Sequence, residues 1–291
     1  MLCLAGTMTS LGKNYSRLWS EAFDDEFFVD GLATWLKYGY VNHKLNYLTD
    51  IAPTHRVMAT EAGEVGRKVG EYIIKNKEII GLFDTFCMGM INGVFPQQAM
   101  INIGMPIESL SQSALLVEMA KVPTELREAC LQWYEDNGMT FMFGQDDKTE
   151  LTREQVMEQC AMMIAMARFV KRFGLTAVGV QYQQGLKDCC PASDFAEGAI
   201  GSTARFPLPD ENGEIICPNT PIPCINEVDM GTAIPQTMLW RLLTSLGLPA
   251  ETTLHDIRWG SEYEGTFYWD MEISGSVPFE HLKGGLKGAR S

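Results

Sequence analysis

The chain has 291 residues and a mass of 32.5 kDa, which is enough for about two domains. With 46% hydrophobic and 21% charged residues, its composition is globular and excludes disorder, collagen or coiled coil as the main organisation. The 23 basic and 37 acidic residues leave a net charge of −14. A nucleic-acid or anionic-membrane partner is therefore not expected, because both need a basic surface. A small neutral ligand or a cation is compatible with this charge.

None of the eight cysteines belongs to a C-x-x-C pair of the kind that binds zinc. The N-terminus lacks the basic and long apolar regions of a signal peptide. No apolar run reaches the roughly 18 residues that a membrane span needs. We therefore expect a protein of the reducing cytoplasm.

The first predicted elements combine apolar runs with an aromatic-rich segment. Residues 1–5 (MLCLA) predict a buried strand, because they form a short continuous apolar run. Residues 27–40 predict a helix, and residues 59–75 predict an amphipathic helix. The apolar run at 79–83 (IIGLF) is typical of a strand in a parallel sheet.

The longest predicted helix covers residues 151–173. Thr152 and Gln155 form a capping box at its start, and Gly174 ends it. Two further helices are expected before it and one strand after it, at residues 111–121, 124–134 and 175–180. This alternation predicts an α/β fold with a Rossmann-like, doubly wound sheet. No G-x-G-x-x-G sequence opens a helix, so a dinucleotide cofactor is not expected.

Five prolines crowd into residues 207–223, and an Asn-Gly turn signal lies among them. We place a domain boundary at this point. Residues 1–212 are predicted to form the Rossmann-like α/β domain, and residues 213–291 the start of a β-rich second domain. Within the second part, a helix is expected at 232–246 and a strand at 265–277.

Acidic residues in apolar or glycine-rich surroundings are the candidates for chemistry, because burying a charge needs a reason. Glu197 lies in DFAEGAI, and Asp229 lies in INEVDMGTA together with Glu227. On an extended segment, Glu227 and Asp229 would point to the same face. Two carboxylates can hold a divalent cation or divide acid and base roles. The plainer alternatives are a helix N-cap, a salt bridge or a surface acid.

Four segments, taken in chain order, resemble motifs of the L-fucose isomerase family. Residues 83–94 (FDTFCMGMINGV) look like its S-M-G-M loop, and residues 179–200 look like the stretch that leads through D-F-x-E into its catalytic glutamate. Residues 224–246 are similar to the E-x-D segment with the catalytic aspartate, and residues 254–259 (LHDIRW) resemble the next strand. The related L-arabinose isomerases share the fold and chemistry, but these motifs are closer to the fucose branch.

The resemblance implies a metal-dependent isomerase that interconverts an aldose and its ketose through a cis-enediol. L-Fucose, D-arabinose or a related sugar is the expected substrate. By resemblance, Glu197 and Asp229 move the proton between C1 and C2 and also ligate the metal. The metal is expected to be Mn²⁺, with Mg²⁺ or Co²⁺ as alternatives, and it stabilises the enediolate. The family forms hexamers or trimers, so a homo-oligomer is also implied.

The chain departs from the family pattern in two ways. The family's third metal ligand is a histidine from further along its catalytic domain, and no match to that motif is found here. His281 is interpreted as a surface residue and His255 as a structural one. The family's chains are also about twice as long, so this chain corresponds to the middle domain and the start of the catalytic domain.

Four residues are substrate-binding candidates. Gln183 and Gln184 are suited to hydrogen-bonding sugar hydroxyls, Met88 belongs to the loop that approaches the substrate in the family, and Trp259 is suited to stacking on a sugar face. The alternative interpretations are solvated loop amides for the glutamines and core packing for Met88 and Trp259.

Two other functions are alternatives to the isomerase. The first is a non-catalytic sugar-binding or regulatory protein that keeps the isomerase fold and would bind sugar without metal. The second is a phosphosugar or nucleotide enzyme, which the lack of a phosphate-binding loop and the charge of −14 disfavour.

Overall fold

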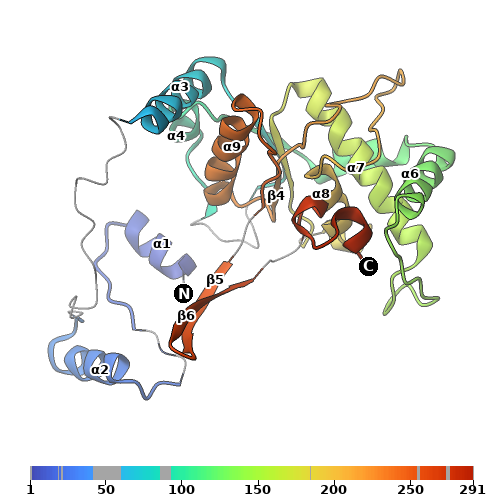
Figure 1. Cartoon of the computed structure of the whole chain (residues 1–291). Coiled ribbons are helices and arrows are strands. Elements are labelled where there is room, and N and C mark those ends of the chain that lie inside the picture. Colours follow the sequence, from blue (N-terminus) through green and yellow to red (C-terminus); the bar gives the residue numbers. More distant parts are fainter. Residues whose placement is uncertain are drawn as a thin grey trace. The chain divides into compact units, whose positions relative to one another are not determined.

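The computed structural model describes residues 2–18, 20, 22–41, 60–85, 93–183, 185–253, 256–272 and 276–290 (Figure 1). The chain divides into two compact units, Met1–Glu64 and Val65–Ser291. The division expected from the sequence, 1–212 and 213–291, stays a prediction. Among the described residues, none of the helices combines the length and the apolar character needed to cross a membrane.

The first unit contains helices α1 (Leu2–Ser10) and α2 (Glu26–Tyr38). The strand predicted at residues 1–5 is therefore wrong. Its Met, Leu, Cys and Ala residues are not β-branched, and a short apolar run alone does not distinguish a strand from a helix. The hydroxyls of Thr9 and Ser10 donate to backbone carbonyls four residues earlier, as they do in a helix.

Helix α2 confirms the prediction for residues 27–40. The side chain of Asp25 caps its start by accepting a hydrogen bond from the Phe28 N–H at 2.8 Å. Gly39 ends it in the left-handed conformation, with φ of 76°.

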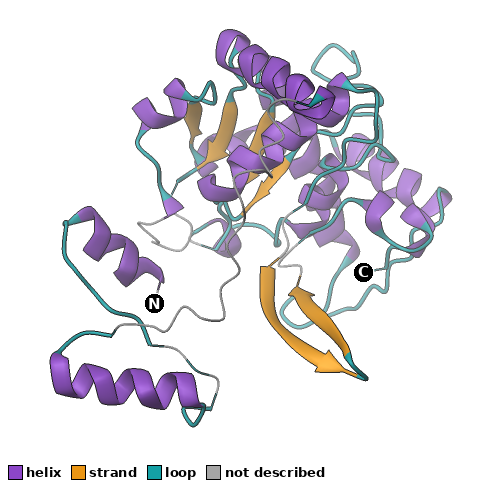
Figure 2. Cartoon of the chain, turned by 60° about the vertical axis from the view of Figure 1, so that its left-hand side comes forward, coloured by secondary structure: helices purple, strands orange, loops and turns teal. Residues whose placement is uncertain are grey.

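The second unit is built on a four-stranded parallel sheet, which makes it an α/β structure (Figure 2). The strand order is β2-β1-β3-β4, and the strands are β1 (Ile80–Phe83), β2 (Ile107–Leu110), β3 (Ala177–Val180) and β4 (Cys224–Asn226). The strands predicted at 79–83 and 175–180 are confirmed as β1 and β3. Strand β4 lies beyond the expected boundary at 212 and pairs with β3.

The helices of this unit agree closely with the sequence. They are α3 (Glu61–Asn76), which begins in the first unit, α4 (Gln97–Asn102), α5 (Gln112–Ala120), α6 (Thr124–Asp136), α7 (Arg153–Phe173), α8 (Asp194–Ile200) and α9 (Met230–Ser245). Those predicted at 59–75, 111–121, 124–134, 151–173 and 232–246 are confirmed as α3, α5, α6, α7 and α9. The short helices α4 and α8 were not predicted.

Alternate residues of the strands enter two separate cores, one on each face of the sheet. Ile80 and Leu82 pack in the core that α3, α4 and α9 cover, whereas Phe83 and Val180 pack in the core that α5 to α8 cover. Figure 1 shows these two groups of helices on opposite sides of the strands. Both faces are therefore apolar, which explains the continuous apolar runs of β1 and β3.

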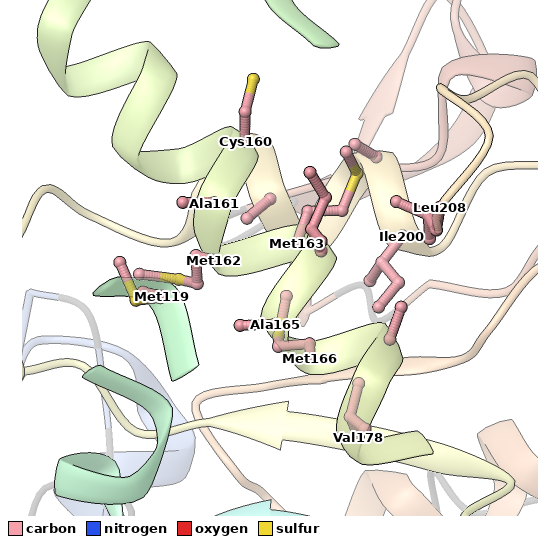
Figure 3. Packing of buried hydrophobic residues seen from close by; sticks show 14 of the residues in the cluster. Met119, Cys160, Ala161, Met162, Met163, Ala165, Met166, Val178, Ile200 and Leu208 are labelled. Carbon is pink, nitrogen blue, oxygen red and sulfur yellow. The ribbon is translucent and has the colours of Figure 1, made fainter. Parts of the chain in front are cut away.

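Helix α7 is the centre of the larger core. Every residue from Cys160 to Ala167 is fully buried, and the helix contacts α5, α6, α8 and β3. Figure 3 shows its side chains on different faces, with Met162 beside Met119 of α5 and Met163 near Ile200 of α8. The capping box of Thr152 and Gln155 and the end at Gly174 are as predicted.

Glu118 of α5 joins this buried helix through ion pairs. Its carboxylate lies 3.3 Å from Arg168 and 3.1 Å from Arg172, both on α7, and 3.1 Å from Lys121. Burial acts to raise the pKa of Glu118, but the hydrogen bonds from Lys121 and Arg172 outweigh it and lower the pKa below its usual value. The carboxylate therefore stays charged although it is buried.

A two-stranded antiparallel hairpin, β5 (Asp256–Tyr263) and β6 (Thr266–Glu272), follows the sheet in the sequence. The strand predicted at 265–277 is confirmed for residues 266–272, which form β6. Glu264 and Gly265 form the turn with φ of 50° and 75°, the pair of positive values that a tight hairpin turn requires. Every residue of β6 is exposed.

Replacing Met166 with alanine tests the central position of α7. Met166 is fully buried, so Met166→Ala should lower the free energy of unfolding by about 2–5 kcal/mol, as large-to-small core substitutions do. Denaturant unfolding followed by circular dichroism measures this change. The matched control is Met142→Ala, where the side chain is 70% exposed, and equal stability of the two variants would contradict the assignment.

Candidate functional site

The candidate site lies at the carboxyl edge of the parallel sheet. In the observed register, Phe83 of β1 is level with Val180 of β3, and Val180 is level with Asn226 of β4. The residues that follow these strands therefore meet at one edge, where ligands bind in open α/β sheets. Tyr182 and Glu227 are among them.

Helix α8 holds Glu197 beside this edge. The N–H groups of Phe195 and Ala196 donate to the side-chain oxygen of Gln159, on α7, at 2.8 and 3.3 Å. The Ile222 N–H donates to the Ile200 carbonyl at 3.1 Å and so ties the end of α8 to the segment before β4. The position of Glu197 therefore depends on the buried helix and on the sheet.

The Glu197 carboxyl group is almost completely buried, with 2% of the residue exposed. The Ser193 hydroxyl donates to its Oε1 at 2.5 Å. Its Oε2 is buried and has no hydrogen-bond partner in the described part of the chain. An unpaired buried oxygen is costly, so Glu197 is a candidate functional residue.

Burial raises the pKa of Glu197 to about 8. The hydrogen bond from Ser193 lowers the pKa, but the negative charges of Asp194 and Glu227 raise it further. Burial also raises the pKa of Asp194. Glu197 is therefore mainly a neutral carboxylic acid at pH 7, able to donate a proton.

A small cavity of about 10 Å³ adjoins Glu197. Its lining is polar on several sides and comprises Glu197, Gly201, Cys224, Asn226, Thr252, Thr253, Ser276 and Pro278. This volume fits about one water molecule, so the cavity is too small for a sugar.

A larger polar pocket opens beside Tyr182. Its volume is about 910 Å³, within the range of small-molecule sites, and its lining includes Thr152, Glu154, Gln155 and Lys187. Burial and the charges of Asp194, Glu227 and Glu197 raise the pKa of Tyr182, so the tyrosine is electrostatically linked to the buried acid. Amide, hydroxyl and charged groups of this kind suit a polyhydroxylated ligand.

The extended geometry expected for Glu227 and Asp229 is wrong. Glu227 and Val228 have φ of 52° and 57°, so the chain turns there and the two acids do not follow the alternation of a strand. A positive φ is unfavourable for a β-branched residue, and the Val228 side chain is buried in the smaller core. Asp229 then caps α9, accepting the Gly231 N–H at 2.8 Å.

A metal site shared by Glu197 and Asp229 stays a prediction. Among the described residues, no group of three His, Cys, Asp or Glu side chains is placed to hold a metal ion. The unpaired Oε2 of Glu197 is suited to a cation, but one oxygen does not form a coordination shell. Asp194 and Glu227 are the carboxylates whose charges act on Glu197, and Asp229 is not among them.

The substrate-binding candidates are only partly described. Gln183 follows β3, and its Oε1 is buried without a hydrogen-bond partner in the described ranges. Gln184 and Met88 lie outside the described residues, as does His255, and Trp259 belongs to β5 with its side chain outside them. His281 is exposed in a short 3₁₀ helix at Phe279–His281, which agrees with its interpretation as a surface residue.

Sequence reasoning missed three groups near Glu197. Asp194 lies one helical turn before it, Tyr182 comes two residues after a strand, and the thiol of Cys224 lines the same cavity. The i, i+3 spacing in DFAE was the available signal for Asp194. The position of Cys224 depends on the pairing of β4 with β3, which no local pattern shows.

No protein-family model matches the chain, and a search of curated proteins found no match.

The raised pKa of Glu197 predicts a specific dependence of stability on pH. The folded state keeps the proton that the unfolded state loses between pH 4.5 and about 8, so stability should fall as pH rises through this window. Glu197→Gln removes this loss, so its stability relative to the wild type should rise from pH 5 to pH 8. Denaturant unfolding at the two pH values measures it.

The control for this comparison is Glu125→Gln, which changes an exposed glutamate of α6. Its stability relative to the wild type should be the same at both pH values. A Glu197→Gln variant that behaves like this control would show that Glu197 is ionised in the folded protein.

Proposed function

We propose that this chain is an aldose–ketose isomerase that acts on L-fucose, D-arabinose or a related sugar through a cis-enediol. Glu197 is proposed as the carboxyl group that transfers the proton. The observation that carries the proposal is its burial at the carboxyl edge of the sheet, with an unpaired oxygen and a pKa of about 8. The resemblance of residues 83–259 to the L-fucose isomerase family supplies the reaction.

The proposed fold is a Rossmann-like, doubly wound domain followed by the start of a β-rich catalytic domain at residues 213–291. A parallel sheet with helices on both faces supports the first part. The exposed hairpin β5–β6 supports the second. Under this proposal the protein works in the cytoplasm as a homo-oligomer.

The proposed chemistry moves a proton between C1 and C2 of the sugar. In the aldose-to-ketose direction, a base removes the proton from C2, the O2 proton passes to O1, and an acid delivers a proton to C1. A neutral Glu197 is suited to the acid role because its pKa lies close to the operating pH. A second carboxylate is needed as base, and Asp229 is the residue that the resemblance offers.

The described residues do not themselves indicate a metal, which enters the proposal through the family resemblance. Mn²⁺, with Mg²⁺ or Co²⁺ as alternatives, comes from the resemblance alone, because the described side chains do not form a three-ligand group. No step above depends on the ion. The substrate is proposed to enter from the polar pocket beside Tyr182, with Gln183, Gln184, Met88 and Trp259 as further contacts.

Deuterium exchange tests the proposed reaction. In D₂O, an aldose panel that includes L-fucose and D-arabinose should gain deuterium at C2, and mass spectrometry detects it before net conversion is visible. Glu197→Gln should slow formation of the ketose, with deuterium at C1, by about 10²–10⁴-fold, because Glu197 is the acid that delivers the proton to C1. The rate should also fall as pH rises above about 8, because Glu197 then loses its proton.

Each outcome of this experiment has a definite meaning. Exchange that stops with EDTA and returns with Mn²⁺ supports the metal-dependent isomerase. No exchange, combined with sugar binding by calorimetry in EDTA, supports the non-catalytic sugar-binding alternative. Ketose formation by Glu197→Gln at the wild-type rate would remove that residue from the mechanism, with Glu125→Gln as the matched surface control.

Asp229→Asn separates a capping role from a ligand role. Asparagine caps helices about as well as aspartate, so stability should be nearly unchanged, whereas Asp229→Ala should lose about 0.5–2 kcal/mol. If Asp229 ligates Mn²⁺, the asparagine variant should bind the ion more weakly by calorimetry. Equal Mn²⁺ affinity in the wild type and the asparagine variant would leave Asp229 as a cap only.

A further inference from the structure

Two residues on the wall of the small cavity beside Glu197 each have a buried oxygen without a partner. The Oε2 of Glu197 and the hydroxyl of Thr252 are buried, and neither has a hydrogen-bond partner in the described ranges. The two residues are 2% and 6% exposed, and both line this cavity. Each unpaired oxygen is costly by itself, and one ligand in the cavity would satisfy both of them.

The walls of this cavity are held together by the fold. The side-chain amide of Gln236, on α9, donates to the carbonyls of Cys224 and Thr252 at 3.0 and 3.3 Å, which joins two of the segments that line the cavity. On the side of α8, a Cβ at Gly198 would lie only 2.9 Å from the carbonyl oxygen of Val277, so the segment after the hairpin packs directly on this helix. The cavity therefore persists because its walls cannot collapse without breaking these contacts.

The size and polarity of the cavity select its occupant. A volume of about 10 Å³ holds about one water molecule, which needs about two to four polar partners. Glu197 and Thr252 supply two, and Asn226 is a third polar residue on the wall. Water donates to a carboxylate and accepts from a carboxylic acid, so it fits both protonation states of Glu197. A hydrated Mg²⁺ does not fit, because it keeps several waters of its own.

We propose that this cavity binds one water molecule, which bridges Glu197 Oε2 and the hydroxyl of Thr252. Thr252 is then a positioning residue: through the water it fixes the orientation of the Glu197 carboxyl group, whose other oxygen accepts the Ser193 hydroxyl at 2.5 Å. The water site itself does not rest on the proposed isomerase activity. The effect of Thr252 on proton transfer does rest on it, because Glu197 is the acid of that reaction.

Valine substitutions at Thr252 and Thr237 test the bridge through the sign of the stability change. Thr237, on α9, is also buried and its hydroxyl has no partner among the described residues, but it does not belong to the lining of this cavity. Replacing an unpartnered buried hydroxyl with a methyl group is neutral or stabilising, so Thr237→Val should leave the denaturation midpoint unchanged or raise it. Thr252→Val should lower the midpoint, because it removes a partner of the bound water.

Crystal structures of the wild type and two variants locate the water directly. The wild type and Thr252→Ser, which keeps the hydroxyl, should show one water within hydrogen-bond distance of Glu197 Oε2, and Thr252→Val should lose it. Crystals soaked in Mn²⁺ reveal a metal at the same position by anomalous scattering. The proposal is overturned if the wild type has no water there, if Mn²⁺ occupies the position, or if Thr252→Val is as stable as the wild type.

Ketose formation separates the positioning role from the proposed function. Thr252→Val should lower kcat several-fold at unchanged KM, because it disturbs the orientation of the acid and leaves the sugar contacts intact, and Thr252→Ser should restore kcat. An unchanged kcat in Thr252→Val would contradict the positioning role. A wild type that forms no ketose contradicts the isomerase proposal alone, because the crystal structures and the unfolding comparison decide the water site without sugar.

Discussion

The burial of helix α7 on every side is the constraint on which the rest of the α/β unit depends. A helix whose residues Cys160–Ala167 are all fully buried must be covered by other elements around its whole circumference. Helices α5, α6 and α8 and strand β3 supply this cover. The capping box at Thr152, Gln155 and the glycine at 174 limit the helix to the length of the core.

The candidate site is a consequence of this packing. The side-chain oxygen of Gln159, on the buried helix, accepts hydrogen bonds from the Phe195 and Ala196 N–H groups of α8. Helix α8 also holds Glu197, whose carboxyl group is shielded from water. Removing water is the main reason for its raised pKa, and Asp194 and Glu227 add to it. The stability of the core therefore offsets the cost of holding an unpaired acid.

The local patterns were reliable where residue type and spacing agree. The apolar strands at 80–83 and 177–180 and the capped helix at 153–173 follow from runs, caps and glycines. The pattern failed at residues 1–5, where apolar character without β-branching gave no preference for a strand. It also failed at 227–229, where Glu227 and Val228 adopt positive φ and the chain turns. Both errors arose where a short segment was interpreted without its neighbours.

The sequence by itself determined the α/β class, most of the helices, and Glu197 as an acid in unusual surroundings, because these depend on composition, periodicity and capping signals close in the chain. Only the tertiary structure decided which groups surround Glu197, because Asp194, Tyr182 and Glu227 act on it through helix packing and strand register. The role of Asp229 as the N-cap of α9 also emerged only from the tertiary structure, because it depends on the turn before that helix. The charges that act on Glu197 are those of Asp194 and Glu227. Long-range contacts set burial, and burial sets the protonation of this site.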